Sequence, residues 1–173
     1  MRNRLWPLAA LSLLAIATPA LAARAMFSYF PADAETRELT DNGFTLLFDK
    51  GLMGSARLRK LMSTEAPASA DLIPADDREL GVPLRTLIGK SDASDLYRIG
   101  EEDQGPAMVR AFCPGSTKAW LGFSPVRIRR NLEIQVLGDD PKTGKAHHCA
   151  TLTLNFRGDW NPRPPGFGPP KTF

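Results

Sequence analysis

Alternation of apolar and polar residues predicts a two-stranded hairpin near the C-terminal end of the chain. Residues 126–137 (VRIRRNLEIQVL) place most apolar side chains on one face and polar side chains on the other. Residues 146–157 (AHHCATLTLNFR) repeat this division after the turn sequence GDDPKTGK. We therefore expect one face of each strand to be buried and the other to contact water.

Three further apolar runs predict additional strands. Residues 107–113 (AMVRAFC) and 118–123 (KAWLGF) precede the hairpin, and segments with Pro or Gly separate all four runs. Their order and spacing predict an antiparallel meander. Residues 44–48 (FTLLF) follow the Asn42-Gly43 turn and predict an earlier strand.

The remaining patterns are shorter. Asp33 is placed to cap a helix that runs through Leu39. Residues 55–63 fit both helical spacing and alternation, and we interpret them as a strand. Residues 64–105 are rich in Asp, Ala, Pro and Ser, and they predict a long connection with short helices and a brief strand at 96–99. The two short helices are expected just before Gly81 and over Leu84, Leu87 and Ile88.

The first 22 residues have the pattern of a cleaved signal peptide. Arg2 and Arg4 precede an apolar run over residues 8–17, and residues 20–22 (ALA) match a signal peptidase site. About ten apolar residues are too few to span a membrane, and no later stretch is long enough either. We therefore expect a periplasmic or extracellular protein that has no transmembrane segment after removal of the leader.

These elements predict a mainly β or α+β fold. The expected architecture is a single antiparallel sheet, a small sandwich or a partly open barrel, with short helices in a long connection. We assign residues 23–160 to one exported β-rich domain, since about 150 residues are enough for one domain with a sizeable core. Phe112, Trp120 and Phe123 are predicted core residues. Residues 161–173 are rich in Pro and Gly and predict a flexible tail.

The charge balance gives little support for a strongly charged partner. The whole chain has 22 Lys and Arg residues and 19 Asp and Glu residues. Loss of Arg2 and Arg4 with the leader leaves 20 basic against 19 acidic residues. This near-neutral balance does not predict a nucleic-acid partner.

Cys113 and Cys149 are the two cysteines of the chain. An oxidising compartment favours a disulfide between them, with a reactive free thiol as the alternative. The bridge would close a loop of about 37 residues and stabilise the fold by on the order of 4 kcal/mol. On a flat sheet the two sulfurs would point to opposite sides. Cys113 would lie on the same strand face as the apolar residue Val109, whereas Cys149 would lie on the same face as the polar residue Thr151. A bulge near the adjacent histidines, or a bent strand end, would reconcile them.

Arg127, Arg129 and Arg130 form the strongest cluster of charge and are the candidate binding residues. On a strand, Arg127 and Arg129 would project from one face about 6 to 7 Å apart. Guanidinium groups bind phosphate and carboxylate bidentately, so the candidate partner is an anionic polymer of the cell envelope or another envelope protein. The alternative is a solvated face paired with Glu133 or neighbouring acids. Arg130 falls on the apolar face and would need a partner if buried.

His147 and His148 are the weak candidates for metal binding. Adjacent strand residues point to opposite faces, so the two imidazoles would need a bulge to hold one ion, whereas His147 and Cys149 share a face. A thiolate ligand also requires a free cysteine, which an oxidising compartment disfavours. We therefore predict no metal site, and no phosphate-binding or dinucleotide-binding motif predicts a cofactor.

The sequence favours a non-enzymatic binding or accessory protein of the cell envelope. It contains no G-x-S-x-G motif of the kind that positions a catalytic serine. The alternative is a small hydrolase of envelope material that uses Asp139, Asp140 or Glu133 with His147 or His148. The sequence does not predict the oligomeric state.

Overall fold

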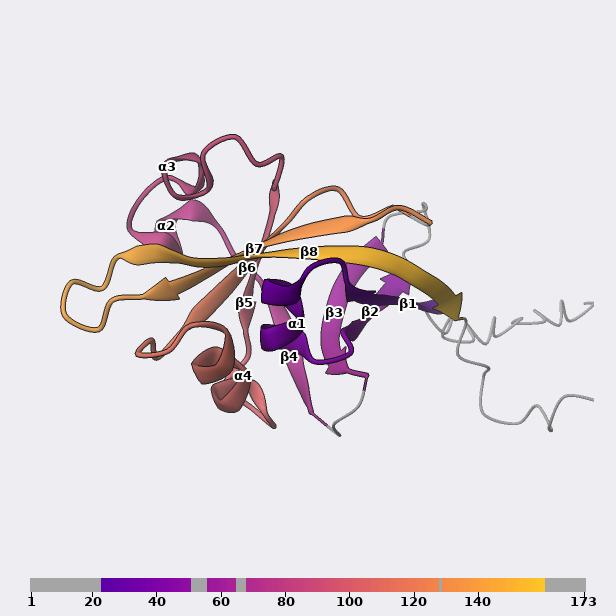
Figure 1. The fold of residues 1–173 in the computed structure, drawn as a ribbon. Helices are drawn as coiled ribbons and strands as arrows, with labels where there is room; N and C mark the ends of the chain where they lie inside the picture. The colour runs from indigo at the N-terminus through magenta and orange to yellow at the C-terminus, as the bar shows by residue number, and fades with distance from the viewer. Residues whose placement is uncertain (1–22, 51–55, 65–67, 128, 161–173) are drawn as a thin grey trace, which may run out of the picture.

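Antiparallel strands close into a β-barrel in the computed structural model of the chain (Figure 1). The predicted signal peptide and the predicted tail lie outside the described residues. The residues that the structure describes are 23–50, 56–64, 68–127 and 129–160.

Eight strands of the described residues form the barrel wall. Each strand pairs with its neighbour in sequence, and the last strand returns to pair with the first. The mainly β, antiparallel prediction is therefore confirmed, although the barrel is closed and not partly open. The strands are β1 (Ala23–Pro31), β2 (Phe44–Lys50), β3 (Ala56–Ser63), β4 (Ser69–Pro74), β5 (Asp95–Ile99), β6 (Ala119–Phe123), β7 (Leu132–Asp139) and β8 (Ala146–Trp160).

Four short helices lie in the connections of the described residues, and three of them are at positions that the sequence predicts. The Asp33 side chain accepts a hydrogen bond of 2.7 Å from the Thr36 amide at the start of the first helix. Gly81 ends the second helix in the left-handed region. No helix in the described part of the chain is long and apolar enough to cross a membrane. The helices are α1 (Ala34–Thr40), α2 (Asp77–Leu80), α3 (Leu84–Ile88) and α4 (Gly105–Phe112).

The predicted strand over residues 107–113 is wrong, because this segment lies mostly in α4. Its seven residues fit alternation, but Met108, Val109 and Phe112 also have the spacing of one helix face. That face packs into the barrel core, and Pro106 lies in the first turn of the helix, where its missing amide costs nothing. Tertiary packing thus selects the helix from two patterns that the sequence allows.

The sequence patterns do not predict β1 and β4. β1 pairs with both β2 and β8 and so closes the barrel, although its residues are a mixture of polar and apolar side chains. β4 places Ala70 and Leu72 in the core and has no other buried residue. Two inward positions in a six-residue segment that also contains Ser, Asp and Pro are too few to identify a strand by alternation.

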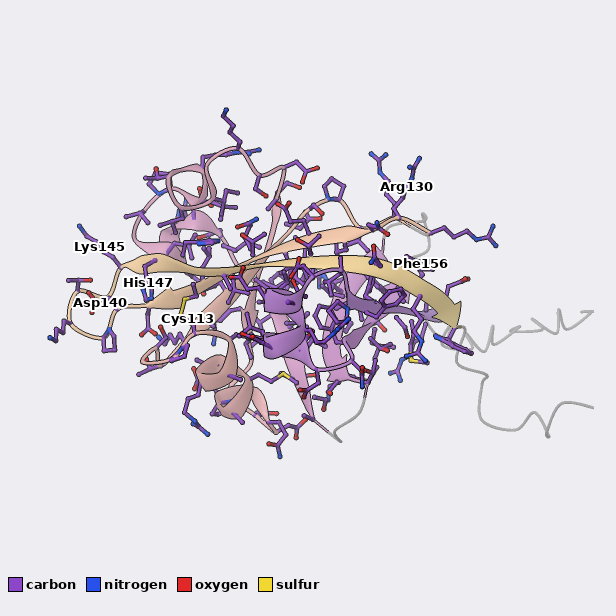
Figure 2. The ribbon with its side chains drawn as sticks, viewed as in Figure 1. Cys113, Arg130, Asp140, Lys145, His147 and Phe156 are labelled. Carbon is purple, nitrogen blue, oxygen red and sulfur yellow. A yellow bond between two sulfur atoms is a disulfide. The ribbon has the colours of Figure 1, made fainter. Side chains whose placement is uncertain are left out.

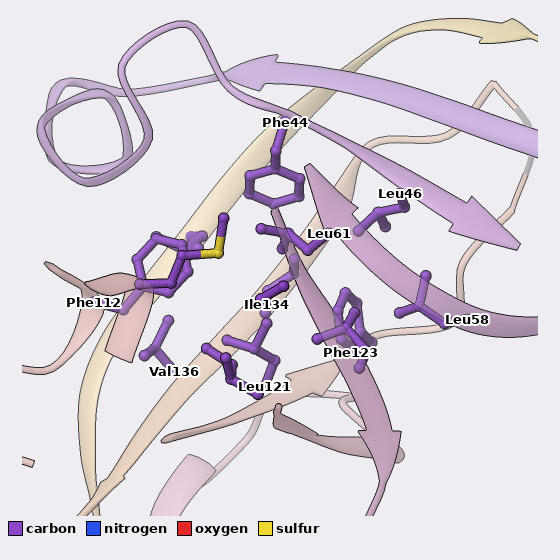
Figure 3. Close-up of a cluster of buried hydrophobic side chains, with 14 of the residues drawn as sticks. Phe44, Leu46, Leu58, Leu61, Phe112, Leu121, Phe123, Ile134 and Val136 are labelled. Carbon is purple, nitrogen blue, oxygen red and sulfur yellow. The ribbon is translucent and has the colours of Figure 1, made fainter. Parts of the chain in front are cut away.

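Side chains from every strand of the barrel fill its interior. Buried aromatic and aliphatic residues of β2, β3, β6, β7 and β8 meet there, and Phe112 of α4 contributes from one end (Figure 3). Thr153 donates a backbone hydrogen bond of 2.9 Å to the Thr36 hydroxyl, which ties α1 to β8 at the same end. The barrel is a packed scaffold, so its candidate sites lie on the outer wall and the loops.

A second apolar cluster lies outside the barrel. Leu80, Leu84 and Ile88 of α2 and α3 pack on Trp120 and Leu137 of the wall. This cover explains why β6 is buried on both faces. The prediction that Phe112, Trp120 and Phe123 are core residues is confirmed.

Candidate functional site

The arginine cluster (Arg127, Arg129 and Arg130) lies on the loop between β6 and β7. All three side chains are exposed, and Arg130 projects from one end of the barrel (Figure 2). β7 begins at Leu132, so the predicted strand over residues 126–137 is wrong at residues 126–127 and 129–131, and residue 128 lies outside the described residues. Arg130 therefore needs no buried partner, and the cluster projects from a loop and not from one strand face.

Local backbone chemistry ends the strand pairing before this loop. Ser124 donates its amide to the Glu133 carbonyl, and the Glu133 amide donates to the Ser124 hydroxyl at 3.2 Å. Pro125 then has no amide to donate. Arg129 has φ 59°, a left-handed conformation that a strand cannot contain and that is uncommon for a bulky side chain. In the sequence, the placement of Arg130 on the otherwise apolar face is the one break in alternation beside this turn.

The arginine cluster has no ion-pair partner among the described residues. The six ion pairs in the described part of the chain involve other cations, such as Arg98 with Glu79 at 3.3 Å. Glu133, which the sequence suggested as a partner, instead accepts hydrogen bonds from Ser91 and Gln135. The guanidinium groups are thus available to an external anion.

Cys113 and Cys149 form the predicted disulfide, with their Cα atoms 5.5 Å apart. Cys113 is the C-cap residue of α4, and Cys149 lies in β8. The bridge joins the helix that closes one barrel end to the wall. Cys113 is 1% exposed, whereas Cys149 is partly accessible.

A β-bulge resolves the predicted conflict of side-chain parity. Val136 pairs with Ala150 but Leu137 pairs with His148, so Cys149 is the extra residue on β8. The bulge lets the Cys149 side chain turn toward α4. The prediction of a bulge beside the histidines is confirmed.

The two histidines have different surroundings. His147 is exposed, and its Nε2 atom lies 3.6 Å from the sulfur of Cys113 and 3.6 Å from the sulfur of Cys149. It pairs across the hairpin with Gly138, whose missing side chain leaves room for the bridge. No interaction in the described residues brings both histidines to one point.

His148 instead borders a polar hollow of about 450 Å³ on the outer wall of β7 and β8. Its Nε2 atom lies 2.8 Å from Gln135 Oε1 and 3.2 Å from the Thr151 hydroxyl. Gln135 donates its amide nitrogen to Glu133 at 2.8 Å, so Gln135 Oε1 is an acceptor and His148 Nε2 must carry a proton. This nitrogen is a hydrogen-bond donor and cannot act there as a general base.

The acids suggested for hydrolysis have structural partners. Asp139 accepts hydrogen bonds from the amide and hydroxyl of Thr117 and from the Lys118 amide, at 2.6 to 2.7 Å. The pKa of Asp140 is lowered, chiefly by the hydrogen bond from the Lys142 amide that shapes the hairpin turn. In the part of the chain described here, neither histidine lies within hydrogen-bond distance of a carboxylate.

A further candidate contact surface is the exposed indole of Trp160 at the end of β8. Trp160 is 58% exposed, and a Cβ atom on Gly158 would lie 3.8 Å from its indole ring. The indole nitrogen donates to the Ser28 hydroxyl at 3.2 Å, so the ring rests on the outer wall beside a hollow of about 420 Å³. The Gly-Asp-Trp spacing at 158–160 is the sequence feature that indicates this arrangement, because a glycine leaves space for a neighbouring ring.

Comparisons with protein-family models, with curated proteins and with solved structures give no match to this chain. The fold and the sites therefore define the chain as a closed antiparallel β-barrel with a disulfide at one end and a basic loop at the other.

Proposed function

We propose that this chain is an exported, non-enzymatic binding protein that contacts an anionic polymer of the cell envelope through the arginine cluster. The observation that carries the proposal is the exposure of three guanidinium groups within four residues, with no ion-pair partner among the residues described. Guanidinium groups form paired hydrogen bonds with carboxylates and phosphates, which such polymers carry.

The loop conformation supports a binding role. Arg129 holds a left-handed backbone that costs free energy for a bulky side chain, and such conformations occur often at functional sites. A polymer with repeated anionic groups would contact several arginines together. Export remains part of the proposal, and the signal peptide pattern and the disulfide both support it.

The geometry favours binding over the hydrolase alternative. A hydrolase would need an imidazole positioned by a carboxylate and facing a nucleophile or a water. Gln135 lies between His148 and Glu133, and His147 contacts the disulfide. These contacts leave the arginine cluster as the better supported site.

Co-sedimentation of the mature protein with purified peptidoglycan sacculi tests the proposal, because their stem peptides carry carboxylates. We expect the triple variant Arg127→Ala, Arg129→Ala, Arg130→Ala to bind about tenfold more weakly at low salt, since each exposed ion pair contributes about 0.5 kcal/mol. Binding by the unchanged protein should weaken as ionic strength rises.

The matched control removes three cations from the other end of the barrel, as Arg110→Ala, Lys118→Ala, Lys142→Ala. All three side chains are exposed, and they lie on α4, before β6 and in the β7–β8 hairpin. This variant has the same net charge as the first and should retain binding. Equal binding by both triple variants and the unchanged protein at low salt would remove the arginine cluster from consideration.

A further inference from the structure

The disulfide and His147 place three metal-binding atoms close together. The Cys113 sulfur, the Cys149 sulfur and one nitrogen of His147 all lie within 4.8 Å of one another. Sulfur and imidazole nitrogen are the ligands that zinc prefers in proteins. The bond between the two sulfurs blocks such binding, so the state of that bond controls whether the ligands are available.

The separations fit a tetrahedral site. Zinc lies about 2.3 Å from thiolate sulfur and about 2.0 to 2.1 Å from imidazole nitrogen, so tetrahedral angles place sulfur and nitrogen about 3.6 Å apart. The measured distance from His147 Nε2 is 3.6 Å to each sulfur. After reduction, the sulfurs need only separate to about 3.8 Å for the same geometry.

The surrounding structure permits that movement and gives an ion access. Cys149 is the unpaired residue of a β-bulge, and Cys113 is at the end of α4, so neither lies inside a regular run of backbone hydrogen bonds. His147 is exposed and Cys149 is partly exposed. An ion can therefore approach from the solvent side, where water would occupy a fourth position.

We propose that reduction converts this disulfide into a metal site in which Cys113, Cys149 and His147 bind a thiophilic divalent cation such as Zn²⁺. A dithiol supplies two electrons and two protons to the S–S bond, gives two protein thiols and itself becomes a disulfide. Binding of the cation then releases the two thiol protons to solvent. Two thiolates and an imidazole select zinc over the oxygen-binding cations Ca²⁺ and Mg²⁺.

The site is separate from the proposed polymer-binding loop. Arg130 and the Cys113–His147 cluster lie at opposite ends of the barrel (Figure 2). Failure of one proposal would therefore leave the other intact. Asp139 and Asp140 belong to the same β7–β8 hairpin as His147. Their carboxylates already accept hydrogen bonds from backbone amides, so we do not include them among the metal ligands.

Titration with Co²⁺ tests the proposal, because this ion takes tetrahedral zinc sites and reports thiolate ligands by charge-transfer absorption. The mature protein is reduced with a dithiol, freed of the reductant without oxygen and titrated beside the oxidised form. We expect one Co²⁺ per reduced chain, with thiolate-to-cobalt absorption that Zn²⁺ abolishes. The oxidised protein should show neither. Equal binding by both forms, or none by the reduced form, would overturn the proposal.

Two histidine variants identify the third ligand. Changing a residue that only supports a metal ligand weakens metal binding about tenfold or more. His147→Ala removes a ligand and should weaken Co²⁺ binding by more than about tenfold, whereas His148→Ala should leave it unchanged. Equal affinity in His147→Ala would also overturn the three-ligand site. Circular dichroism follows the fold in parallel. If the reduced chain unfolds, Zn²⁺ should refold it, and failure to do so contradicts the proposal.

Discussion

Gly138 of β7 lies directly against the sulfur of Cys113. A Cβ atom placed on Gly138 would overlap both that sulfur and the Ser116 hydroxyl oxygen. Ser116 in turn donates a hydrogen bond of 2.7 Å to the Asp139 carbonyl. The absence of a side chain at position 138 therefore allows the end of α4 to reach the barrel wall and form the bridge to β8.

The first prediction concerns this close approach. Gly138→Ala should lower the free energy of unfolding by about 1 to 3 kcal/mol, because the added methyl group has no space. It should also increase the fraction of protein with free thiols. Urea denaturation and thiol labelling measure the two effects.

Gly122→Ala is the matched control for this prediction. Gly122 also lies in a strand, but its Cβ atom would meet its nearest neighbours at 3.6 Å, an ordinary contact distance. The control should stay within about 1 kcal/mol of the unchanged protein. If both variants are equally stable, the packing of Gly138 against the disulfide does not constrain the fold.

Removal of the disulfide is the second prediction. The double variant Cys113→Ser, Cys149→Ser should lose about 2 to 4 kcal/mol, because the bridge joins residues 36 positions apart and restricts the unfolded chain. The urea midpoint of the oxidised protein should fall to that of the double variant when a reductant is added without metal. An unchanged midpoint would show that the bridge contributes little to stability.

The hairpin and the cysteine pair could be predicted because local chemistry determines them. The alternation over residues 146–157 indicates one buried face, and the apolar residues of that face lie in the barrel core. The parity conflict between Cys113 and Cys149 predicted a bulge, since side-chain direction reverses there. Barrel closure was different, because β1 and β8 are far apart in sequence and no local pattern reports their pairing.

The candidate sites were less predictable for the same reason. The left-handed backbone of Arg129 turns the chain at a point where the alternation shows only one break, the placement of Arg130 on the apolar face. The contact of His147 with the disulfide depends on where α4 ends, and the sequence favoured a strand there. The hydrogen bond between His148 and Gln135 depends on the register of β7 against β8, and the one-residue bulge at Cys149 changes that register.

Asp139 gives the third prediction. Burial raises the pKa of Asp139, but hydrogen bonds from Thr117 and Lys118 outweigh it, and the net pKa is lowered. A carboxyl group with a lowered pKa in the folded state stabilises the fold above its unfolded pKa of about 3.9, and this stabilisation is lost as the pH falls through the folded value. Asp139→Asn should therefore cost about 2 kcal/mol at pH 7 and much less near pH 2.

Urea denaturation across this pH range measures the effect. Asp92→Asn is the matched control, because Asp92 is exposed. The free energy of unfolding of this variant at pH 7 should stay within about 0.5 kcal/mol of that of the unchanged protein. A loss for Asp139→Asn that is the same at both pH values would show that shape and not charge explains the role of Asp139.

The fourth prediction is a gain of stability inside the barrel. Tyr29 is fully buried, and its hydroxyl has no hydrogen-bond partner in the described part of the chain. Burial raises the pKa of Tyr29 to about 12, so the group is neutral at pH 7. Tyr29→Phe removes the unsatisfied hydroxyl but keeps the ring, whose centroid lies 5.8 Å from that of Phe156 in an edge-on contact. The free energy of unfolding should rise by about 1 kcal/mol.

Tyr97→Phe is the contrasting control. Burial raises the pKa of Tyr97, and the nearby backbone of Leu58 partly offsets that rise, so this hydroxyl is close to a polar backbone group. The Tyr97 ring contacts Phe123 with centroids 5.7 Å apart. Loss of that hydroxyl should lower the free energy of unfolding by about 1 kcal/mol, because the ring packing is kept and the polar contact with the Leu58 backbone is removed. Thermal denaturation of both variants compares the two hydroxyl groups directly. If Tyr29→Phe is destabilised as much as Tyr97→Phe, the Tyr29 hydroxyl has a partner, and the barrel interior contains a polar contact that its packed side chains do not reveal.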